Sequence, residues 1–286
     1  HGHRRIAAGG DALILFVTFA IRTRGKITMG ELKKIAVIGG GNMGGAIARG
    51  IVKAGLASAG QIVITRRNAE ALKSWAADGY AVTTSNSEAV SGADVVIFAV
   101  KPYQIADVIA GTRSSLAAGA VAVSIATGVG VAQLTEMLGQ GVAAVRVMPN
   151  TAAEVGESLT AIAPSASASE EQTRLVEKIF SALGLALIVT EEQMPALTAL
   201  ASCGIAHALR YIRAAQESAI EMGLNSRLAA DVVAQTVKGA AQLILTNHSH
   251  PEAEIDKVCT PKGVTIAGIN AMEHAGFTSA VMKGMM

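Results

Sequence analysis

Short β-branched apolar runs alternate with helical patterns through the first two thirds of the chain, and this alternation constrains the fold more than any other feature. The run KKIAVI (33–38) ends in glycines, and apolar residues then recur at helical spacing as far as Gly55. The later apolar runs lie at 61–65, 81–84, 94–100, 120–126, 142–148, 159–163 and 185–189, and helical patterns lie at 68–77, after Pro102 and at 171–183. Strands that alternate with helices form sheets with right-handed crossovers and helices on both faces. The sequence therefore predicts an α/β fold with an N-terminal doubly wound sheet.

Beyond about Glu191 the sequence carries helical spacing and no further strand pattern. Gly223 is a typical helix end, and Asn225 or Ser226 can cap the helix that follows it. The expected helices share apolar stripes and lie at 197–219, from 226 to about 244, at 263–275 and at 277–285. The sequence thus predicts an all-α C-terminal domain whose broad apolar faces pack against a second subunit.

The length of 286 residues fits two domains better than one or three. We place the sheet domain at 29–192 and the helical domain at 193–286. Residues 1–28 precede the first methionine, Met29, and their apolar stretch is about half the length that spans a bilayer. They are interpreted as a leader or vector-derived sequence that is not part of the fold, and no association with a membrane is expected.

Charge and composition exclude several classes of function. Lysine and arginine (24) nearly balance aspartate and glutamate (22), and no run of like charge occurs, so a nucleic-acid-binding face is not expected. Cys203 and Cys259 are too few for a zinc cluster or a disulfide framework, and the six histidines have no metal-ligand spacing. His248 and His250 are interpreted as part of a polar turn. No metal is therefore expected, and the cysteines favour a reducing, cytoplasmic location.

A glycine motif opens the first predicted helix directly after the first predicted strand. Gly39, Gly41 and Gly44 form G-x-G-x-x-G, with Asn42 and Met43 between the last two. In this context the first glycine makes the turn, the second lets the backbone approach a pyrophosphate, and the third allows close helix packing. Backbone N–H groups at the helix N-terminus bind the phosphates. The sequence therefore predicts a Rossmann-type dinucleotide site.

The end of the second predicted strand favours NADPH over NADH. An NAD site carries an acidic residue there for the ribose 2′-hydroxyl, whereas this chain has Thr65, Arg66 and Arg67 followed by Asn68. Hydroxyl and guanidinium groups bind a 2′-phosphate. NADPH is therefore the expected donor and NADH a weaker one. The alternative is that Arg66 and Arg67 are solvated surface charges.

Three further segments follow predicted strands at the edge of the sheet where such folds bind ligands. Lys101 can meet a phosphate, a ribose or a carboxylate, or remain an exposed lysine before a proline. Asn150 can bind the nicotinamide carboxamide or the substrate. Small residues at these strand ends leave room for a flat nicotinamide. The residues that we expect to contact the cofactor here are Ala99, Val100, Lys101, Pro102, Ala126 and Gly128.

Several segments together resemble the pyrroline-5-carboxylate reductase family. They are IAVIGGGNMGGAIARG (35–50), DVVIFAVKP (94–102), RVMPNT (146–151) and HPEAEIDKVCTPKGVTIAGINAMEHAG (250–276), and the similarity extends over nearly all of 29–286. The resemblance implies a two-domain enzyme that reduces 1-pyrroline-5-carboxylate to L-proline, the last step of proline biosynthesis, by hydride transfer from NADPH to the C=N carbon. It also implies homo-oligomers, namely dimers with interleaved helical domains that can assemble into larger rings.

The resemblance also assigns residues to the substrate. One segment, VCTPKGVTI, is similar to the family's signature loop, which enters a helix and lines the substrate pocket. By that similarity Val258, Thr260, Gly263 and Thr265 hold the substrate carboxylate and ring nitrogen, and Asn86 lies near the adenosine ribose. A helix N-terminus suits a carboxylate. The Thr265 hydroxyl is expected to hydrogen-bond the imine nitrogen, which makes Thr265 the expected catalytic residue.

The chain departs from the family's pattern at three positions. Lys262 stands where the signature has a glycine, which matters if that position needs a positive φ. We expect an exposed lysine there, with a cation beside the substrate carboxylate as the alternative. His207 stands at a common tyrosine position and is expected to be a hydrogen-bonded core residue without a catalytic role. Ala152 replaces a proline, which implies a less rigid turn.

Two alternatives keep the same architecture. One changes the substrate to another cyclic imine or to a β-hydroxyacid. Hydroxyacid enzymes of this build generally need a lysine on the first helix of the second domain, where this chain has Ser202 and His207. The other alternative is an NADP-binding sensor or scaffold without turnover, for which Lys262 is the only support in the sequence.

Overall fold

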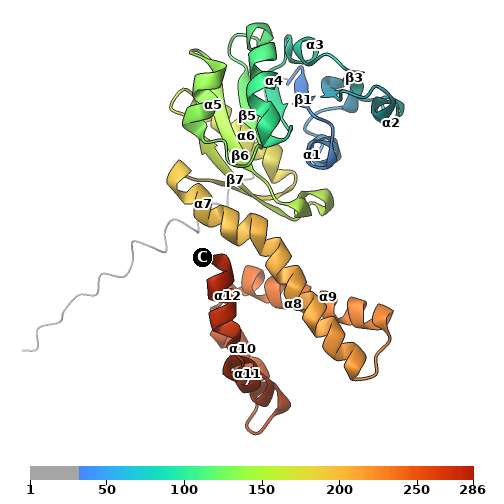
Figure 1. Cartoon of the computed structure of the whole chain (residues 1–286), viewed down its shortest axis with the longest axis vertical. Coiled ribbons are helices and arrows are strands. Elements are labelled where there is room, and N and C mark those ends of the chain that lie inside the picture. The colour runs from blue at the N-terminus through green and yellow to red at the C-terminus, as the bar shows by residue number, and fades with distance from the viewer. Residues whose placement is uncertain (1–31) are drawn as a thin grey trace, which may run out of the picture. The chain divides into compact units, whose positions relative to one another are not determined.

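Eight β-strands form one sheet in the order β3-β2-β1-β4-β5-β6-β7-β8 (Figure 1). They belong to residues 32–286, which are the residues that the computed structural model describes, and the predicted leader at 1–28 lies outside them. The strands are β1 (Ile35–Ile38), β2 (Ile62–Thr65), β3 (Ala81–Thr83), β4 (Val95–Phe98), β5 (Val121–Ser124), β6 (Ala143–Met148), β7 (Ser158–Pro164) and β8 (Gly184–Ile188). Each predicted strand is therefore present, within two residues of its expected ends.

The first six strands run parallel, and the last two make the sheet mixed. β7 pairs antiparallel with β6, and β8 pairs parallel with β7. The link from Met148 to Ser158 holds only the short 3₁₀ turn Thr151–Val155, whereas a parallel return needs about a dozen residues or more. The expectation of a crossover before every strand is thus wrong for β7, while the predicted Rossmann-type sheet is confirmed.

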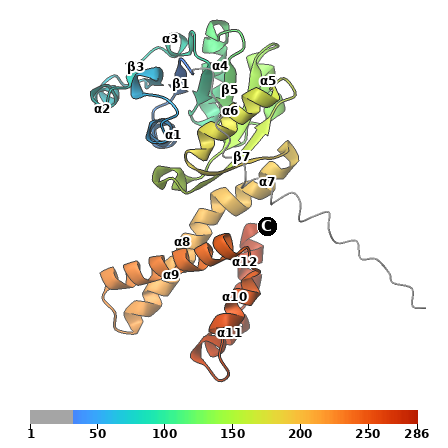
Figure 2. The same ribbon diagram turned by 180° about the vertical axis from the view of Figure 1, so that it is seen from behind.

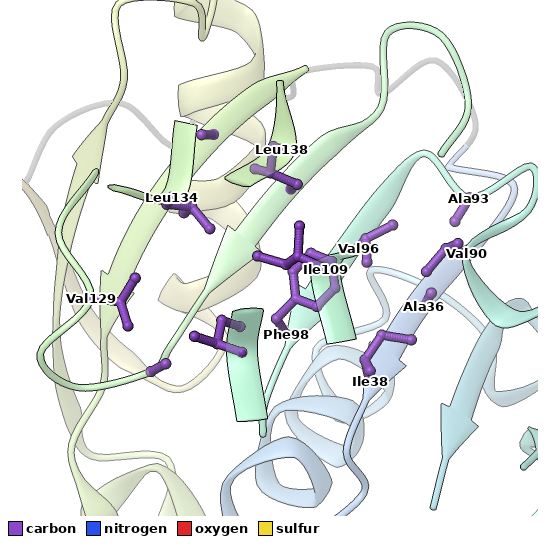
Figure 3. Close-up of a cluster of buried hydrophobic side chains, with 14 of the residues drawn as sticks. Ala36, Ile38, Val90, Ala93, Val96, Phe98, Ile109, Val129, Leu134 and Leu138 are labelled. Carbon is purple, nitrogen blue, oxygen red and sulfur yellow. The ribbon is translucent and has the colours of Figure 1, made fainter. Parts of the chain in front are cut away.

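One face of the sheet packs against a continuous apolar cluster (Figure 3). Alternate strand residues, among them Ile38, Val96 and Phe98, point to this face and meet Ile109 and Leu134, which come from helices. The helices that supply this cluster are α3 (Asn86–Val90), α4 (Ile105–Thr112) and α5 (Val131–Leu138). Period-two alternation on strands that are buried on both faces explains why the strands read as continuous apolar runs.

The opposite face carries α6 (Glu170–Ser181), which lies in front of the sheet in the view from behind (Figure 2). α1 (Asn42–Lys53) buries Ile47 and Ile51. Leu183, just after α6, lies so close to α1 that a Cβ placed on Gly50 would be 2.2 Å from Leu183 Cδ2. Leu183 therefore packs against α1, and Gly50 leaves room for it.

No strand follows Ile188 in the described chain, as predicted for the helical domain. A π-helical stretch, Thr198–Cys203, joins two α-helices and is called the π segment below. It interrupts the single helix predicted from 197 to 219, and a helix after His250 was not predicted at all. The helices are α7 (Met194–Leu197), α8 (Gly204–Glu221), α9 (Ser226–Asn247), α10 (Pro251–Val258), α11 (Val264–His274) and α12 (Phe277–Met285).

The long helices α8 and α9 leave most of their apolar side chains exposed within the described chain. Each contains a single buried residue, Ala219 in α8 and Ala229 in α9. Leu209, Leu243 and Leu245 are about half exposed or more. By length and composition alone α9 could also cross a membrane, and 11% of its apolar stretch is buried. Contiguous exposed apolar surface on two long helices is typical of a surface that binds another protein or a membrane.

Candidate active site

The sheet brings the predicted cofactor residues to one edge. β1, β4 and β5 pair in register, so that Ile38 lies beside Phe98 and Phe98 beside Ser124. All three strands are parallel, and the segments that leave their carboxyl ends therefore lie side by side. These segments are the glycine loop (39–44), 99–102 and 126–128. Ligands bind at this edge in sheets of this kind.

The three motif glycines have different tasks in the glycine loop. Gly39 has φ +104°, and a Cβ there would be 2.6 Å from Ala99 O. A Cβ on Gly44 would be 2.2 Å from Gly39 O. A Cβ on Gly41 would meet no other atom of the described chain within 4 Å. The fold itself thus requires Gly39 and Gly44, whereas Gly41 keeps open a space outside the loop.

That open space faces the N-terminus of α1. Gly41 caps the helix without a side-chain hydrogen bond to its first N–H groups, and the first turn has no acidic residue. Asn42 is exposed and Met43 is partly buried. Free N–H groups at a helix N-terminus bind anions. The residues present therefore fit the pyrophosphate of a dinucleotide.

Thr65 holds the glycine loop from behind. Its buried Oγ1 accepts a hydrogen bond from Gly39 N at 3.2 Å, and its carbonyl oxygen accepts one from Gly40 N at 2.8 Å. The structure gives Thr65 this supporting task, and its contact with a 2′-phosphate stays a prediction. Arg66 and Arg67, which follow it, are exposed and form no ion pair with a carboxylate of residues 32–286. They remain the predicted ligands of a 2′-phosphate.

The other predicted cofactor residues lie where the sequence places them, and their contacts with a cofactor remain predictions. Lys101 and Pro102 are exposed just after β4, and Ala99 and Val100 before them are partly buried. Gly128 is exposed with φ +82°, close to the buried Ala126. Asn86 is the first residue of α3 and is partly buried.

A buried aromatic cluster supports α1, and the sequence did not reveal it. Trp75, in α2 (Lys73–Ala77), is buried against Gly45, where a Cβ would be 2.9 Å from the indole ring. The Arg49 guanidinium carbon lies 5.0 Å from the centroid of this ring, and the Tyr80 ring meets it edge-on at 5.1 Å. Cation–π and edge-to-face contacts of this kind stabilise packing. The one tryptophan of the chain therefore lies within a turn of the glycine loop.

Asn150 is 5% exposed, and both polar atoms of its side chain have partners in the chain. Oδ1 accepts a hydrogen bond from Ala152 N at 3.1 Å, and Nδ2 donates to Ala201 O at 3.2 Å. Its backbone N–H donates to Ser158 Oγ at 3.0 Å. The side chain thus holds parts of the chain together, and its predicted contact with substrate or nicotinamide stays a prediction.

The predicted substrate loop is a β-turn that leads into α11. Gly263 N donates to Thr260 O at 2.9 Å, and Lys262 between them has φ +61°. A Cβ on Gly263 would be 2.4 Å from Thr260 Oγ1, so no side chain fits there. Gly263 caps α11 without a side-chain hydrogen bond, and Thr265 is the second residue of the helix. The free N–H groups of α11 and Thr265 thus lie in the same first turn of the helix.

Nothing in the described chain covers this loop. Val258 is 61% exposed, Val264 is 89% exposed, and Thr260 is also exposed. Apolar side chains exposed to this degree next to a helix N-terminus are typical of a surface that packs on another partner. The loop therefore presents its substrate residues at the surface of the single chain.

Lys262 has the positive φ at which a residue other than glycine is strained. Its left-handed conformation is normally left to glycine, and it costs a residue with a Cβ about 1 kcal/mol or more. The ammonium group is exposed and pairs with no carboxylate of the described chain. This agrees with the expected exposed lysine.

Glu254 fixes the turn between α9 and α10, which leads to the substrate loop. It accepts hydrogen bonds from Ser249 Oγ at 2.6 Å and from Asn247 Nδ2 at 3.4 Å, and it pairs with Lys257 Nζ at 2.8 Å. The Lys257 and Ser249 hydrogen bonds lower the pKa of Glu254 to about 2. The turn predicted at His248 and His250 is present, and this carboxylate holds it together.

His207 does not have the hydrogen bond that we expected. Its Nδ1 is buried and finds no hydrogen-bond partner in the part of the chain that the structure describes. Groups of three or more side chains arranged to hold a metal ion are likewise absent from residues 32–286.

A mixed Rossmann-type sheet, a glycine loop at its carboxyl edge and a following helical region together define an NADP-dependent oxidoreductase. Residues 34–128 match a family described as NADP oxidoreductase, coenzyme F420-dependent. Residues 191–286 match the pyrroline-5-carboxylate reductase dimerisation family. The helical region is therefore a self-association domain.

Proteins that are similar over nearly the whole chain specify which family of oxidoreductases it belongs to. Pyrroline-5-carboxylate reductase 2 of Dictyostelium discoideum is 39% identical, over 89% of this chain and 90% of the relative. Pyrroline-5-carboxylate reductase 1 of the same organism is 42% identical over 88% of this chain, which spans about half (48%) of that relative. The structure of Plasmodium falciparum pyrroline carboxylate reductase with NADP bound is 26% identical, with a TM-score of 0.81 over 89% of this chain and 95% of that one. The chain belongs to the pyrroline-5-carboxylate reductase family.

Proposed function

We propose that this protein reduces 1-pyrroline-5-carboxylate to L-proline with NADPH, as a pyrroline-5-carboxylate reductase of proline biosynthesis. The match of the helical region 191–286 to the family's dimerisation domain carries this proposal. Nucleotide-binding domains are shared by oxidoreductases with many substrates, so the sheet domain alone would not specify one. The matched region contains the substrate loop and α11.

The chain's own residues supply binding and orientation. In this proposal the N–H groups at the start of α1 hold the pyrophosphate, and the exposed Arg66 and Arg67 pair with the 2′-phosphate. The N–H groups at the start of α11 hold the substrate carboxylate, and the Thr265 hydroxyl hydrogen-bonds the ring nitrogen. When bound, NADPH supplies a hydride to the C=N carbon, and the nitrogen ends protonated. Positioning and charge placement then supply most of the catalysis.

The direct test follows NADPH absorbance after the purified full chain is mixed with DL-1-pyrroline-5-carboxylate, with L-proline measured as product. Turnover that forms L-proline in equal amount to the NADPH consumed supports the proposal. Binding of NADPH without turnover would support the assignment of the cofactor site to the sheet domain and would contradict the proposed substrate. A β-hydroxyacid with NADP⁺ serves as the comparison substrate.

The arginine pair is expected to determine the choice of donor. In an Arg66→Ala/Arg67→Ala variant, kcat/KM with NADPH should fall about 10-fold, which is the effect of losing one charge-assisted hydrogen bond. The value with NADH should stay within about two-fold, because NADH has no 2′-phosphate for the guanidinium groups to bind. Arg113→Ala, at an exposed arginine elsewhere in the same domain, is the matched control. An equal loss with both donors would contradict the assignment.

We propose that the self-association takes the form of a dimer, which can assemble further into a ring. The exposed apolar faces of α8 and α9 supply the contact surface. A dimer would also complete the active site, because a second copy would shield the uncovered substrate loop from water. Sedimentation analysis with the assay run at decreasing protein concentration tests this. Full activity in a monomer would reject it.

We also propose that the protein works in the cytoplasm. Cys203 and Cys259 are both free thiols, as a reducing compartment requires. Fractionation of cells that express the chain, followed by detection of the protein, decides the matter, and recovery in a membrane or organelle fraction would reject the proposal.

A further inference from the structure

Three residues at alternate positions along and just after β6 hold the start of the helical domain. Arg146 Nη1 pairs with Glu191 Oε1, Met148 Sδ lies 2.8 Å from Thr198 Oγ1, and Asn150 Nδ2 donates to Ala201 O at 3.2 Å. The Thr198 hydroxyl also lies 2.7 Å from Met194 O one turn earlier, so its one proton has two acceptors within reach. Residues i, i+2 and i+4 of an extended chain point to the same side. We call Arg146, Met148 and Asn150 the β6 rail.

The partners of the β6 rail come in the same order along the chain as the rail residues that they contact. They run from the turn before α7, through Thr198, to Ala201 in the π segment. The three contacts therefore fix where residues 191–201 lie along β6 and in which direction they run. All three are well covered, since the Arg146 side chain is 14% exposed and Met148 and Asn150 are buried.

The last contact of the rail falls within the π segment itself. π-helical turns are rare, occur mostly as short bulges within α-helices, and are frequent at functional sites. Ala201 lies within this segment, and its carbonyl oxygen accepts the Asn150 amide. Asn150 follows β6 at the carboxyl edge of the sheet, the same edge as the glycine loop and residues 126–128. The π segment is thus tied to the edge where the nicotinamide is expected.

We infer that Asn150 is a positioning residue, which holds the π segment in register with the cofactor edge of the sheet and acts through that segment. This inference rests on the proposed function for its effect on hydride transfer, but the tether itself does not. The reacting atoms must approach within about 3.5 Å for transfer, and misplacement by about 1 Å costs as much as 100-fold in rate. A short tether between the two domains controls that distance.

Asn150→Asp is the sharpest test, because it removes one function of the side chain and keeps the other. Aspartate retains the oxygen that accepts from Ala152 N, whereas the donor to Ala201 O becomes a second carboxylate oxygen facing a carbonyl. Asn225→Asp is the matched control. Asn225 Oδ1 caps α9 by accepting from Leu228 N at 2.9 Å, and the residue is exposed. Both variants add the same charge and keep their cap.

The first readout is independent of activity. Hydrogen–deuterium exchange of residues 194–203 should be about five-fold faster in Asn150→Asp than in the wild type, since one buried hydrogen bond is lost. Asn225→Asp should leave that peptide unchanged. Met148→Leu, which removes the Sδ acceptor and leaves the bond from Thr198 Oγ1 to Met194 O in place, should accelerate the same peptide and so tests the rail if Asn150→Asp folds poorly.

The second readout separates positioning from general damage. In Asn150→Asp, kcat/KM for the substrate should fall about 10-fold, the Kd for NADPH should stay within two-fold, and the primary deuterium isotope effect with NADPH labelled at the transferred hydrogen should increase. A loss of folded protein would lower the rate and leave the isotope effect unchanged. Unchanged exchange in both Asn150→Asp and Met148→Leu overturns the tether. Faster exchange with an unchanged isotope effect overturns the positioning role, and a wild type without turnover rejects the proposed function alone.

Discussion

A Gly41→Ala variant is expected to fold as the wild type does and to bind NADPH about 100-fold more weakly. A Cβ at this position meets no atom of the described chain within 4 Å, and φ of −78° is open to any residue, so the fold should tolerate it. The methyl group would instead occupy the space in which a pyrophosphate approaches the N–H groups of α1. The loss corresponds to one or two charge-assisted hydrogen bonds.

Two other glycines make the comparison decisive. Gly44→Ala places a Cβ 2.2 Å from Gly39 O, so it should destabilise the protein by about 1 to 3 kcal/mol, as overpacking does. Gly60→Ala, remote and unobstructed, should change neither stability nor binding. Thermal unfolding reports stability, and energy transfer from Trp75 to bound NADPH reports the Kd. If Gly41→Ala binds NADPH as tightly as Gly60→Ala, the pyrophosphate does not lie at this loop.

The sheet was predictable because its information is local. Strands buried on both faces, such as 35–38 and 95–98, appear in the sequence as continuous β-branched runs whatever their neighbours are. The direction of β7 is not local in this sense. It depends on the length of the link after Met148. The apolar run at 159–163 fits a parallel strand and an antiparallel strand equally well.

The glycine loop was equally predictable, since its geometry demands particular residue types at a particular spacing. Thr65 and Asn150 show where such reasoning stops. A hydroxyl or an amide at a strand end can point toward a ligand or toward the protein's own backbone, and the residue type is the same in both cases. Here Thr65 Oγ1 accepts from Gly39 N, and Asn150 Nδ2 donates to Ala201 O.

Features that depend on contacts between distant segments were missed. α10 has no buried residue, and PEAEIDKV is too short and too polar for apolar spacing to predict it. The π segment contacts residues of β6 and the loop after it, and no local pattern in the sequence records those contacts. The sequence did identify Lys262 as a position at which φ matters, but only the structure shows the value of +61°.

Removal of the Thr265 hydroxyl is expected to disable the substrate site without disturbing the cofactor site. In Thr265→Val, kcat/KM for 1-pyrroline-5-carboxylate should fall about 100-fold, as when one preorganised donor to a reacting group is lost. The Kd for NADPH should stay within about two-fold, because Thr265 lies on α11 and the glycine loop on α1. Valine keeps the shape of threonine, and the hydroxyl makes no hydrogen bond within residues 32–286 that the folded chain would miss.

Two further variants decide what a loss of rate in Thr265→Val means. Thr265→Ser restores a hydroxyl without the methyl group, and it should recover most of the activity if hydrogen bonding to the ring nitrogen is the essential contribution. Thr135→Val removes a threonine hydroxyl that bonds only to Val131 O at 2.8 Å in α5, and it should leave catalysis unchanged. If serine fails to restore the rate, the packing of the methyl group matters more than the hydrogen bond, and the assignment of Thr265 as the catalytic residue is wrong. If valine itself is fully active, the ring nitrogen is held by another group, and the N–H groups at the start of α11 become the first to test.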